Sequence, residues 1–196
     1  MINRELYMEQ ITPFIDKPFV KVITGIRRCG KSVVLRLIRE ELLRRGVSED
    51  YIIYMNFESF EWIDMKEAKA LYAHIREATK ASGKYYILLD EIQEVTDWEK
   101  AVNAFLVDLD VDIYVTGSNS RLLSSEFSTY LAGRYVAFHI MTLSFREYLL
   151  FHDLPLTISV SDRKTEVLKY LRMGGFPAIH TANYDYNAIY KIVYDI

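Results

Sequence analysis

The fold is decided by the stretch Gly25-Ile26-Arg27-Arg28-Cys29-Gly30-Lys31-Ser32. It matches the pattern G-x-x-x-x-G-K-[ST], in which two glycines let the backbone curl so that successive N–H groups point at a phosphate. The apolar run 19–24 before it predicts a buried strand, and residues 33–43 after it carry apolar side chains at helical spacing. The stretch therefore predicts a strand-to-helix turn, where the positive end of the helix also attracts an anion.

Side chains at the end of this loop predict a nucleotide site with a metal ion. Lys31 would reach the β- and γ-phosphates, and the Ser32 hydroxyl would bind Mg²⁺. The side chains at the variable positions 27–29 are interpreted as spacers. The predicted nucleotide-binding residues of the loop are Gly25, Ile26, Arg27, Arg28, Cys29, Gly30, Lys31, Ser32 and Val33.

Apolar runs and helical patterns alternate along the chain. The runs are too apolar for a sheet that is wetted on one face, which indicates parallel strands covered by helices on both faces. The predicted strands are 19–24, 51–57, 85–89, 111–115 and 135–140. The predicted helices are 3–16, 33–43, 66–81, one that opens with the capping-box pattern Thr96-Asp97-Trp98-Glu99, and 120–131.

The pattern changes after residue 153. Residues 162–173 indicate a helix, the sequence Gly-Gly-Phe-Pro at 174–177 interrupts it, and 184–196 begins another amphipathic stretch. We therefore expect residues 1–153 to form an α/β core with an N-terminal helix. Residues 154–196 are expected to be the truncated start of a helical lid or C-terminal region.

Composition limits the classes of partner. The 196 residues are 51% hydrophobic, which suits a domain with a sizeable core, and the net charge of −3 gives no bulk attraction to nucleic acid or to an anionic membrane. The net charge does not exclude a local basic patch on the surface. The single cysteine, Cys29, rules out an intrachain disulfide. Apolar runs of about 18 residues and a signal-peptide pattern are lacking, so a cytoplasmic protein without a membrane span is the expectation.

Two adjacent carboxylates follow the third predicted strand. In an open parallel sheet, ligands bind outside the carboxyl ends of the strands. Asp90 would therefore lie near the phosphate loop and hold Mg²⁺, through water or through Ser32. Glu91 would polarise the attacking water as a general base. The alternative for both is an acidic loop without a catalytic role.

Polar residues also follow the other strands. Ser118 and Asn119, after the fourth strand, could hydrogen-bond the γ-phosphate or the attacking water, and an ordinary polar turn is an equal alternative. Asn56, which ends the second strand, could contact Glu91 or solvent. Arg134, before the fifth strand, is either a solvent-facing arginine or a functional one.

With these residues in place, the chain resembles the AAA+ ATPases. The loop 25–32 looks like their Walker A motif, and Asp90-Glu91 looks like their Walker B motif. Thr116-Gly117-Ser118-Asn119 lies where that family keeps its sensor 1 residue, and Arg134 lies where its arginine finger usually sits. The resemblance implies a P-loop NTPase three-layer sandwich with a five-stranded parallel sheet, followed by the start of a helical C-terminal region.

A more specific resemblance is to a group of poorly characterised bacterial and archaeal ATPases with a C-terminal domain of unknown function. The matching stretches are Leu-Asp-Glu-Ile-Gln at 89–93, Thr-Gly-Ser at 116–118, Gly-Arg-Tyr at 133–135, Leu-Ser-Phe-Arg-Glu at 143–147 and Gly-Gly-Phe-Pro at 174–177. The chain departs from AAA+ proteins after residue 153. The arginines in that part of the sequence are Arg163 and Arg172, and neither sits in a recognisable sensor 2 motif.

The sequence thus predicts a Mg²⁺-dependent ATPase that drives or gates a conformational change, with ATP and Mg²⁺ as cofactors. Its candidate catalytic residues are Glu91, Lys31, Arg134 and Asn119. A homo-oligomer and an unidentified protein partner are expected. A P-loop phosphotransferase for small molecules and a nucleotide-binding switch with little turnover are the alternatives.

Overall fold

The computed structural model describes residues 4–118, 122, 130–181, 184, 187–189 and 191. These residues form two compact units, which are described separately. The larger unit comprises Glu5–Gly25 and Lys31–His139. The second comprises Arg4, Ile26–Gly30 and the described residues from Ile140 onward. The expected helix 120–131 and the amphipathic stretch 184–196 lie largely outside the described residues.

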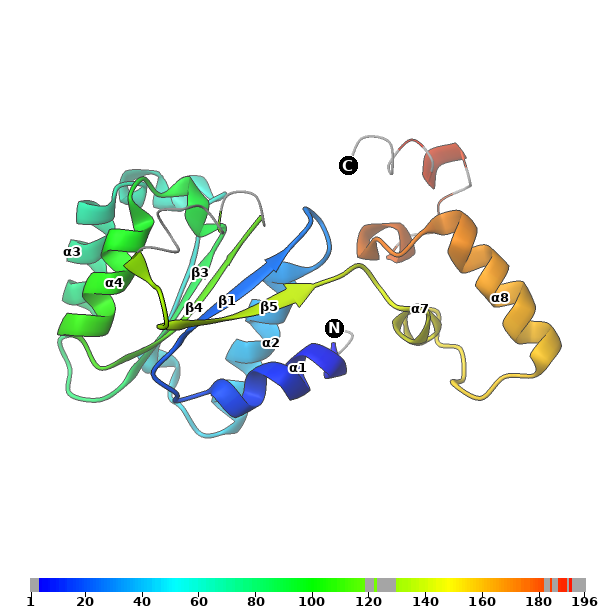
Figure 1. The fold of residues 1–196 in the computed structure, drawn as a ribbon, viewed down its shortest axis with the longest axis horizontal. Coiled ribbons are helices and arrows are strands. Elements are labelled where there is room, and N and C mark those ends of the chain that lie inside the picture. Colours follow the sequence, from blue (N-terminus) through cyan, green and yellow to red (C-terminus); the bar gives the residue numbers. More distant parts are fainter. Residues whose placement is uncertain are drawn as a thin grey trace. The chain divides into compact units, whose positions relative to one another are not determined.

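One parallel sheet forms the centre of the larger unit (Figure 1). Its five strands, counted over the described residues, have the order β2-β3-β4-β1-β5. The pairs β2–β3, β3–β4 and β4–β1 are parallel, and Figure 1 shows β5 running in the same direction as β1. The bounds are β1 (Val20–Gly25), β2 (Ile52–Asn56), β3 (Tyr85–Asp90), β4 (Val111–Gly117) and β5 (Tyr135–Ile140). The predicted five-stranded parallel sheet is therefore confirmed.

Helices cover both faces of this sheet. Helices α1 (Glu5–Ile11) and α2 (Lys31–Arg44) lie on one face, and α3 (Ala68–Ala78) and α4 (Trp98–Asp108) lie on the other (Figure 1). Short 3₁₀ turns lie between these elements at η1 (Thr12–Phe14), η2 (Glu49–Tyr51), η3 (Phe60–Met65) and η4 (Ile92–Glu94). The predicted three-layer α/β sandwich is confirmed.

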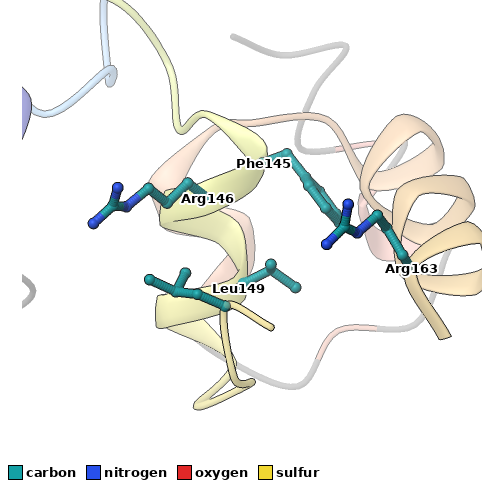
Figure 2. Close-up of a pocket in the computed structure, with 5 residues that line it drawn as sticks. Phe145, Arg146, Leu149 and Arg163 are labelled. Atoms are coloured by element: carbon teal, nitrogen blue, oxygen red, sulfur yellow. The ribbon is translucent and has the colours of Figure 1, made fainter. Parts of the chain in front are cut away.

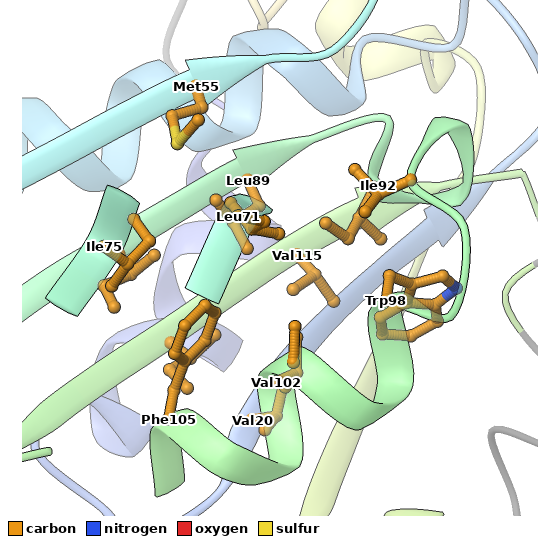
Figure 3. Packing of buried hydrophobic residues seen from close by; sticks show 14 of the residues in the cluster. Val20, Met55, Leu71, Ile75, Leu89, Ile92, Trp98, Val102, Phe105 and Val115 are labelled. Atoms are coloured by element: carbon orange, nitrogen blue, oxygen red, sulfur yellow. The ribbon is translucent and has the colours of Figure 1, made fainter. Parts of the chain in front are cut away.

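The main core lies between the sheet and the helices α3 and α4. Because strand side chains alternate between the two faces, every second residue of a strand contributes to this layer. Figure 3 shows Met55, Leu89 and Val115 from the strands beside Leu71 of α3 and Phe105 of α4, and all five are fully buried. Burial of this apolar surface fixes the strand register, and the register in turn fixes where each strand ends.

The predicted capping box at Thr96 is wrong. Helix α4 begins at Trp98 with Asp97 as its N-cap, and Asp97 makes no side-chain cap hydrogen bond. Thr96 forms a parallel bridge with Glu67, and its N–H donates to the carbonyl of Lys66 at 2.9 Å. This extended pairing holds the Thr96 backbone outside the first turn of the helix.

The second unit carries α7 (Phe145–Phe151), α8 (Val160–Met173) and the turn η5 (Pro177–His180). The capping box Ser144–Glu147 is present at the start of α7. Helix α8 is followed by its C-cap Gly174, whose φ of 77° lies in the left-handed region that favours glycine. The units divide between His139 and Ile140, so that α7 groups with α8, whereas the sequence pattern divides the chain after residue 153. Within the described part of the chain, no helix is both long and apolar enough to cross a membrane.

Candidate nucleotide-binding site

The loop between β1 and α2 has the backbone of a tight turn. Gly30 has a φ of 105°, which favours glycine, and Arg28 has a φ of 64° although it carries a side chain. The side chains of Ile26, Arg27 and Arg28 are exposed, whereas Cys29 is fully buried. The two arginine side chains thus lie at the surface, whereas the Cys29 side chain is part of the buried interior.

Lys31, the first residue of α2, is almost completely buried, with 4% of its surface exposed. Its Nζ lies 3.4 Å from the carbonyl oxygen of Gly25, to which it donates. The same Nζ lies 3.3 Å from Oε1 of Glu91. The structure therefore brings together the lysine predicted to bind phosphate and the carboxylate predicted to activate water.

Asp90 ends β3 and is fully buried. Its Oδ1 accepts a hydrogen bond from the Thr116 hydroxyl at 2.5 Å, and its Oδ2 accepts one from the Tyr54 hydroxyl at 3.0 Å. Burial and the neighbouring Asp90 charge raise the pKa of the Tyr54 phenol, which therefore remains a donor. Each carboxylate oxygen keeps a further lone pair, so these bonds orient Asp90 and leave it able to hold a magnesium-bound water.

Glu91 follows β3 in a left-handed conformation, with a φ of 55°. Such a backbone costs on the order of 1–3 kcal/mol for a residue other than glycine, and it is most common at functional sites. The Glu91 N–H donates to the Thr116 hydroxyl oxygen at 2.9 Å, and its Oε2 accepts from Nε2 of Gln93 at 2.6 Å. Thr116 thus ties the backbone of Glu91 to the side chain of Asp90.

Gln93 contacts Glu91, but the sequence pointed to it only as part of the stretch 89–93 and not as a site residue. Its Oε1 is buried and has no hydrogen-bond partner among the described residues. A Cβ on Gly117 would overlap this oxygen, so the Thr-Gly-Ser sequence needs glycine at its centre. The one sequence signal for Gln93 and Tyr54 is general: polar side chains in or beside buried strands need hydrogen-bond partners.

The other predicted residues have mixed outcomes. Ser118 follows β4 and is partly exposed at the strand ends that carry Asp90, while Asn119 lies outside the described residues. The Oδ1 of Asn56 accepts from the N–H of Glu58 at 3.0 Å, which is a local turn contact. Ser32 opens α2 beside Lys31 and is partly buried. Val33 is likewise partly buried on the same helix.

Arg134 lies far from these residues. It is exposed, and its Nη1 donates to Oδ1 of Asn103 on α4 at 2.9 Å. Its carbonyl accepts from the N–H of Val20, the first residue of β1. Since the phosphate loop follows the last residue of β1, Arg134 lies at the opposite end of the sheet, about 20 Å away for a strand of this length. The structure does not bring Arg134 to the chain's own Lys31.

The donor set near Asp90 suits magnesium better than a transition metal. Among the described residues, no group of three or more His, Cys, Asp or Glu side chains could hold a metal ion. Mg²⁺ instead keeps several waters and needs one or two carboxylates plus substrate phosphates. The buried Asp90 carboxylate is the kind of donor that this requirement names.

A pocket of about 320 Å³ lies in the second unit (Figure 2). Phe145, Arg146 and Leu149 contribute to it from α7, Arg163 contributes from α8, and Leu156 lies between the two helices. None of these residues is among the predicted nucleotide-binding residues.

Sequence comparisons place the chain in a family. A family model described as an AAA domain matches residues 17–149. An uncharacterised protein of Haemophilus influenzae is 43% identical over 184 residues, which are 93% of this chain and 46% of that protein. An uncharacterised protein of Methanocaldococcus jannaschii is 35% identical over 184 residues, which are 91% of this chain and 39% of that protein. The chain thus spans less than half the length of these curated relatives.

Solved structures share the fold. The AMPPCP-bound DnaA of Aquifex aeolicus is similar with a TM-score of 0.57 at 15% identity, over 99% of this chain and 62% of that one. The ORC1 protein of Aeropyrum pernix, solved in complex with DNA, has a TM-score of 0.56 at 16% identity, over 92% of this chain and 58% of that one. Such distant likeness shows the fold alone, and the family is shown by the model that matches most of the sequence. The chain therefore belongs to the family described as an AAA domain.

Proposed function

We propose that this chain binds MgATP at the loop 25–32 and hydrolyses the γ-phosphate, and that the cycle drives or gates a conformational change in the protein. The observation that carries the proposal is the convergence of Lys31, Asp90 and Glu91 at the carboxyl ends of two parallel strands. Membership of the AAA domain family supports it.

Binding would use the loop backbone and three side chains. The N–H groups of the loop and the start of α2 would meet the phosphates, and Lys31 would neutralise charge on the β- and γ-phosphates. Ser32 and Asp90 would hold Mg²⁺, with Asp90 acting through a bound water. The bound Mg²⁺ would supply charge neutralisation on the phosphate oxygens.

Hydrolysis would begin with the release of Glu91 from Lys31. A γ-phosphate carries more negative charge than one carboxylate, so it would compete for the Lys31 ammonium at the loop. The Glu91 carboxylate would then keep its bond to Gln93, with its other oxygen available to accept a proton from the attacking water. The backbone bond to Thr116 would keep that oxygen near the strand end.

The same ion pair favours a second candidate function. If Glu91 stays paired with Lys31 or Gln93 when nucleotide is bound, the chain would be a nucleotide-binding switch with little turnover. Titration of the full-length protein with MgATP by calorimetry, with phosphate release measured on the same sample, separates the two. Binding with phosphate release supports the ATPase, binding without release supports the switch, and absence of binding contradicts both.

A further inference from the structure

Arg4 joins three separate segments of the second unit through one buried guanidinium. Only 2% of its surface is exposed. Its Nη1 donates to the carbonyl of Cys29 at 2.9 Å, and its Nη2 donates to the carbonyl of Met141 at 2.9 Å. Its Nε donates to Oε1 of Glu147 at 2.5 Å. Since the guanidinium is planar and its donors have fixed directions, these contacts define its position completely.

The contact with Cys29 fixes a peptide of the phosphate loop. In a trans peptide the C=O and the following N–H point in opposite directions. With the Cys29 carbonyl held on Arg4, the N–H of Gly30 must therefore point to the side away from Arg4. If this peptide turned over, a carbonyl dipole would take the place of that N–H group and would repel a phosphate.

Gly30 shows how closely Arg4 approaches the loop. An ideal Cβ at Gly30 would lie 3.3 Å from Nη1 of Arg4 and 3.9 Å from Cγ of Pro177. The glycine is thus needed for its positive φ and also for this close approach. Pro177 belongs to the Gly-Gly-Phe-Pro stretch, which therefore packs beside the loop within this unit.

The position of Arg4 is set by a second layer of contacts. The Oε2 of Glu147 accepts from the N–H and the hydroxyl of Ser144, so that Oε1 is left for Arg4. The N–H of Leu143 donates to the carbonyl of Gly175 at 2.6 Å, and a Cβ at Gly175 would lie 2.6 Å from the Leu143 carbonyl oxygen. The stretches 143–147 and 174–177 thus support one another and present Glu147 to Arg4.

We propose that Arg4 is a positioning residue for the nucleotide site, which keeps the Cys29–Gly30 peptide oriented with its N–H toward the phosphates. Arg4 acts through the loop backbone and contacts no phosphate itself. The inference rests on the proposed function, because it needs an anion at the loop. It also gives a role to the Leu-Ser-Phe-Arg-Glu stretch, whose glutamate holds the arginine in place.

The test compares MgATP affinity and steady-state kinetics of Arg4→Met and Arg4→Lys with the parent, in the full-length protein. The matched control is Arg44→Met, which removes an exposed arginine paired with Glu41 on the far end of α2. We expect Arg4→Met to weaken MgATP binding about tenfold or more, since a charge-assisted bond to the loop is lost. The KM should rise while kcat stays within about twofold, because loop orientation affects ground state and transition state alike.

Arg4→Lys and one further variant, Glu147→Gln, protect this test against misfolding. Arg4→Lys keeps the charge and one donor position, so it should regain part of the lost affinity. Glu147→Gln should weaken MgATP binding although Glu147 reaches the loop only through Arg4, and its effect should not add to that of Arg4→Met. Unfolding midpoints measured without nucleotide identify any variant whose loss of affinity comes from unfolding. The remaining variants then decide whether Arg4 positions the loop.

The outcomes separate this inference from the proposed function. Parent affinity in both Arg4→Met and Glu147→Gln, with binding lost in Lys31→Ala, would overturn the role of Arg4 and leave the nucleotide site standing. A parent protein that does not bind MgATP would overturn both. A fall in kcat at unchanged KM would also contradict the inference, since it would place Arg4 in the chemical step.

Discussion

Nζ of Lys31 lies 3.3 Å from Oε1 of Glu91, so the two predicted site residues form an ion pair in which each neutralises the other. Both side chains are largely shielded, with 4% and 15% of their surfaces exposed. A weakly hydrated ion pair of this kind is costly to break unless another charge replaces one partner. The γ-phosphate would be that charge, so nucleotide binding and the release of Glu91 would be one event.

Lys31→Ala should nearly abolish MgATP binding. It removes the cation at the loop and leaves the Glu91 carboxylate facing the phosphate site, so attraction is replaced by repulsion. Calorimetric titration with MgATP measures the effect. Lys100→Ala is the control, since Lys100 is exposed and pairs with Asp97 on α4. Unchanged affinity in Lys31→Ala would show that the loop is not the nucleotide site.

Tyr54→Phe should weaken the binding of Mg²⁺ in the ATP complex. The change removes one of two hydroxyl donors that orient the buried Asp90 carboxylate. The loss of a hydrogen bond to a charged group costs about 1.5–3 kcal/mol. Part of this cost should appear as lower stability, and the rest as a several-fold higher half-saturating Mg²⁺ concentration. The control is Tyr51→Phe, whose hydroxyl donates to the Ser82 carbonyl at the surface. Equal Mg²⁺ titrations for both variants would contradict this role of Asp90.

Arg134 is expected to act on a nucleotide held by a neighbouring subunit. It is exposed beside the edge strand β5 and lies at the opposite end of the sheet from its own Lys31. Arg134→Ala should therefore bind MgATP normally and turn over slowly, with the 10³–10⁵-fold effects of arginine fingers as an approximate upper guide.

A mixing experiment tests this action in trans. Arg134→Ala and Glu91→Gln, each nearly inactive alone, should recover partial ATPase activity when combined. Arg45→Ala, which removes another exposed arginine, should behave as the parent does. Parent activity per subunit that stays constant on dilution into the monomeric range would rule out a contribution from a neighbour.

Acid should destabilise the unit that contains α7 and α8. His152 and His180 are joined by a ring-to-ring hydrogen bond of 3.1 Å, and Nε2 of His180 donates to the Gly174 carbonyl. Burial lowers the pKa of His180 below its usual 6.5, so the unfolded chain binds a proton more readily than the folded one. The stabilisation is therefore complete above the unfolded pKa and is lost as the pH falls toward the folded value.

Unfolding midpoints at about pH 7.5 and about pH 5.5 measure this effect. The parent should lose stability at the lower pH, and His180→Asn should lose less. His74→Asn, which changes a histidine beside Trp62 in the larger unit, is the control. An equal acid-induced loss in the parent and His180→Asn would assign the effect to other groups.

The fold could be predicted because its signals are local. The loop pattern marks one strand-to-helix turn, and the apolar runs mark the buried strands without any knowledge of their neighbours. The positions of Lys31, Asp90 and Glu91 followed from a general property of parallel sheets, whose ligands lie at the carboxyl ends of the strands. The failed capping box at Thr96 depended on a bridge to Glu67 that local pattern does not contain.

The supporting residues could not be predicted because their partners are distant in sequence. Tyr54 reaches Asp90 across 36 positions, and Thr116 reaches it across 26. Arg4 lies 143 positions from Glu147. It belongs to the predicted helix 3–16, whose charged residues are typical of any helix start. Such contacts depend on strand register and on packing within a unit, and a single sequence records neither directly.

The central claim is that Glu91 activates the water that attacks a bound ATP, and phosphate release by Glu91→Gln tests it most directly. The substitution keeps the size of the side chain and removes the base, so MgATP should bind as in the parent while turnover falls by on the order of 10²-fold or more. Glu94→Gln, three residues along the chain, is the matched control and should retain parent turnover. Parent-rate phosphate release from Glu91→Gln would contradict the account.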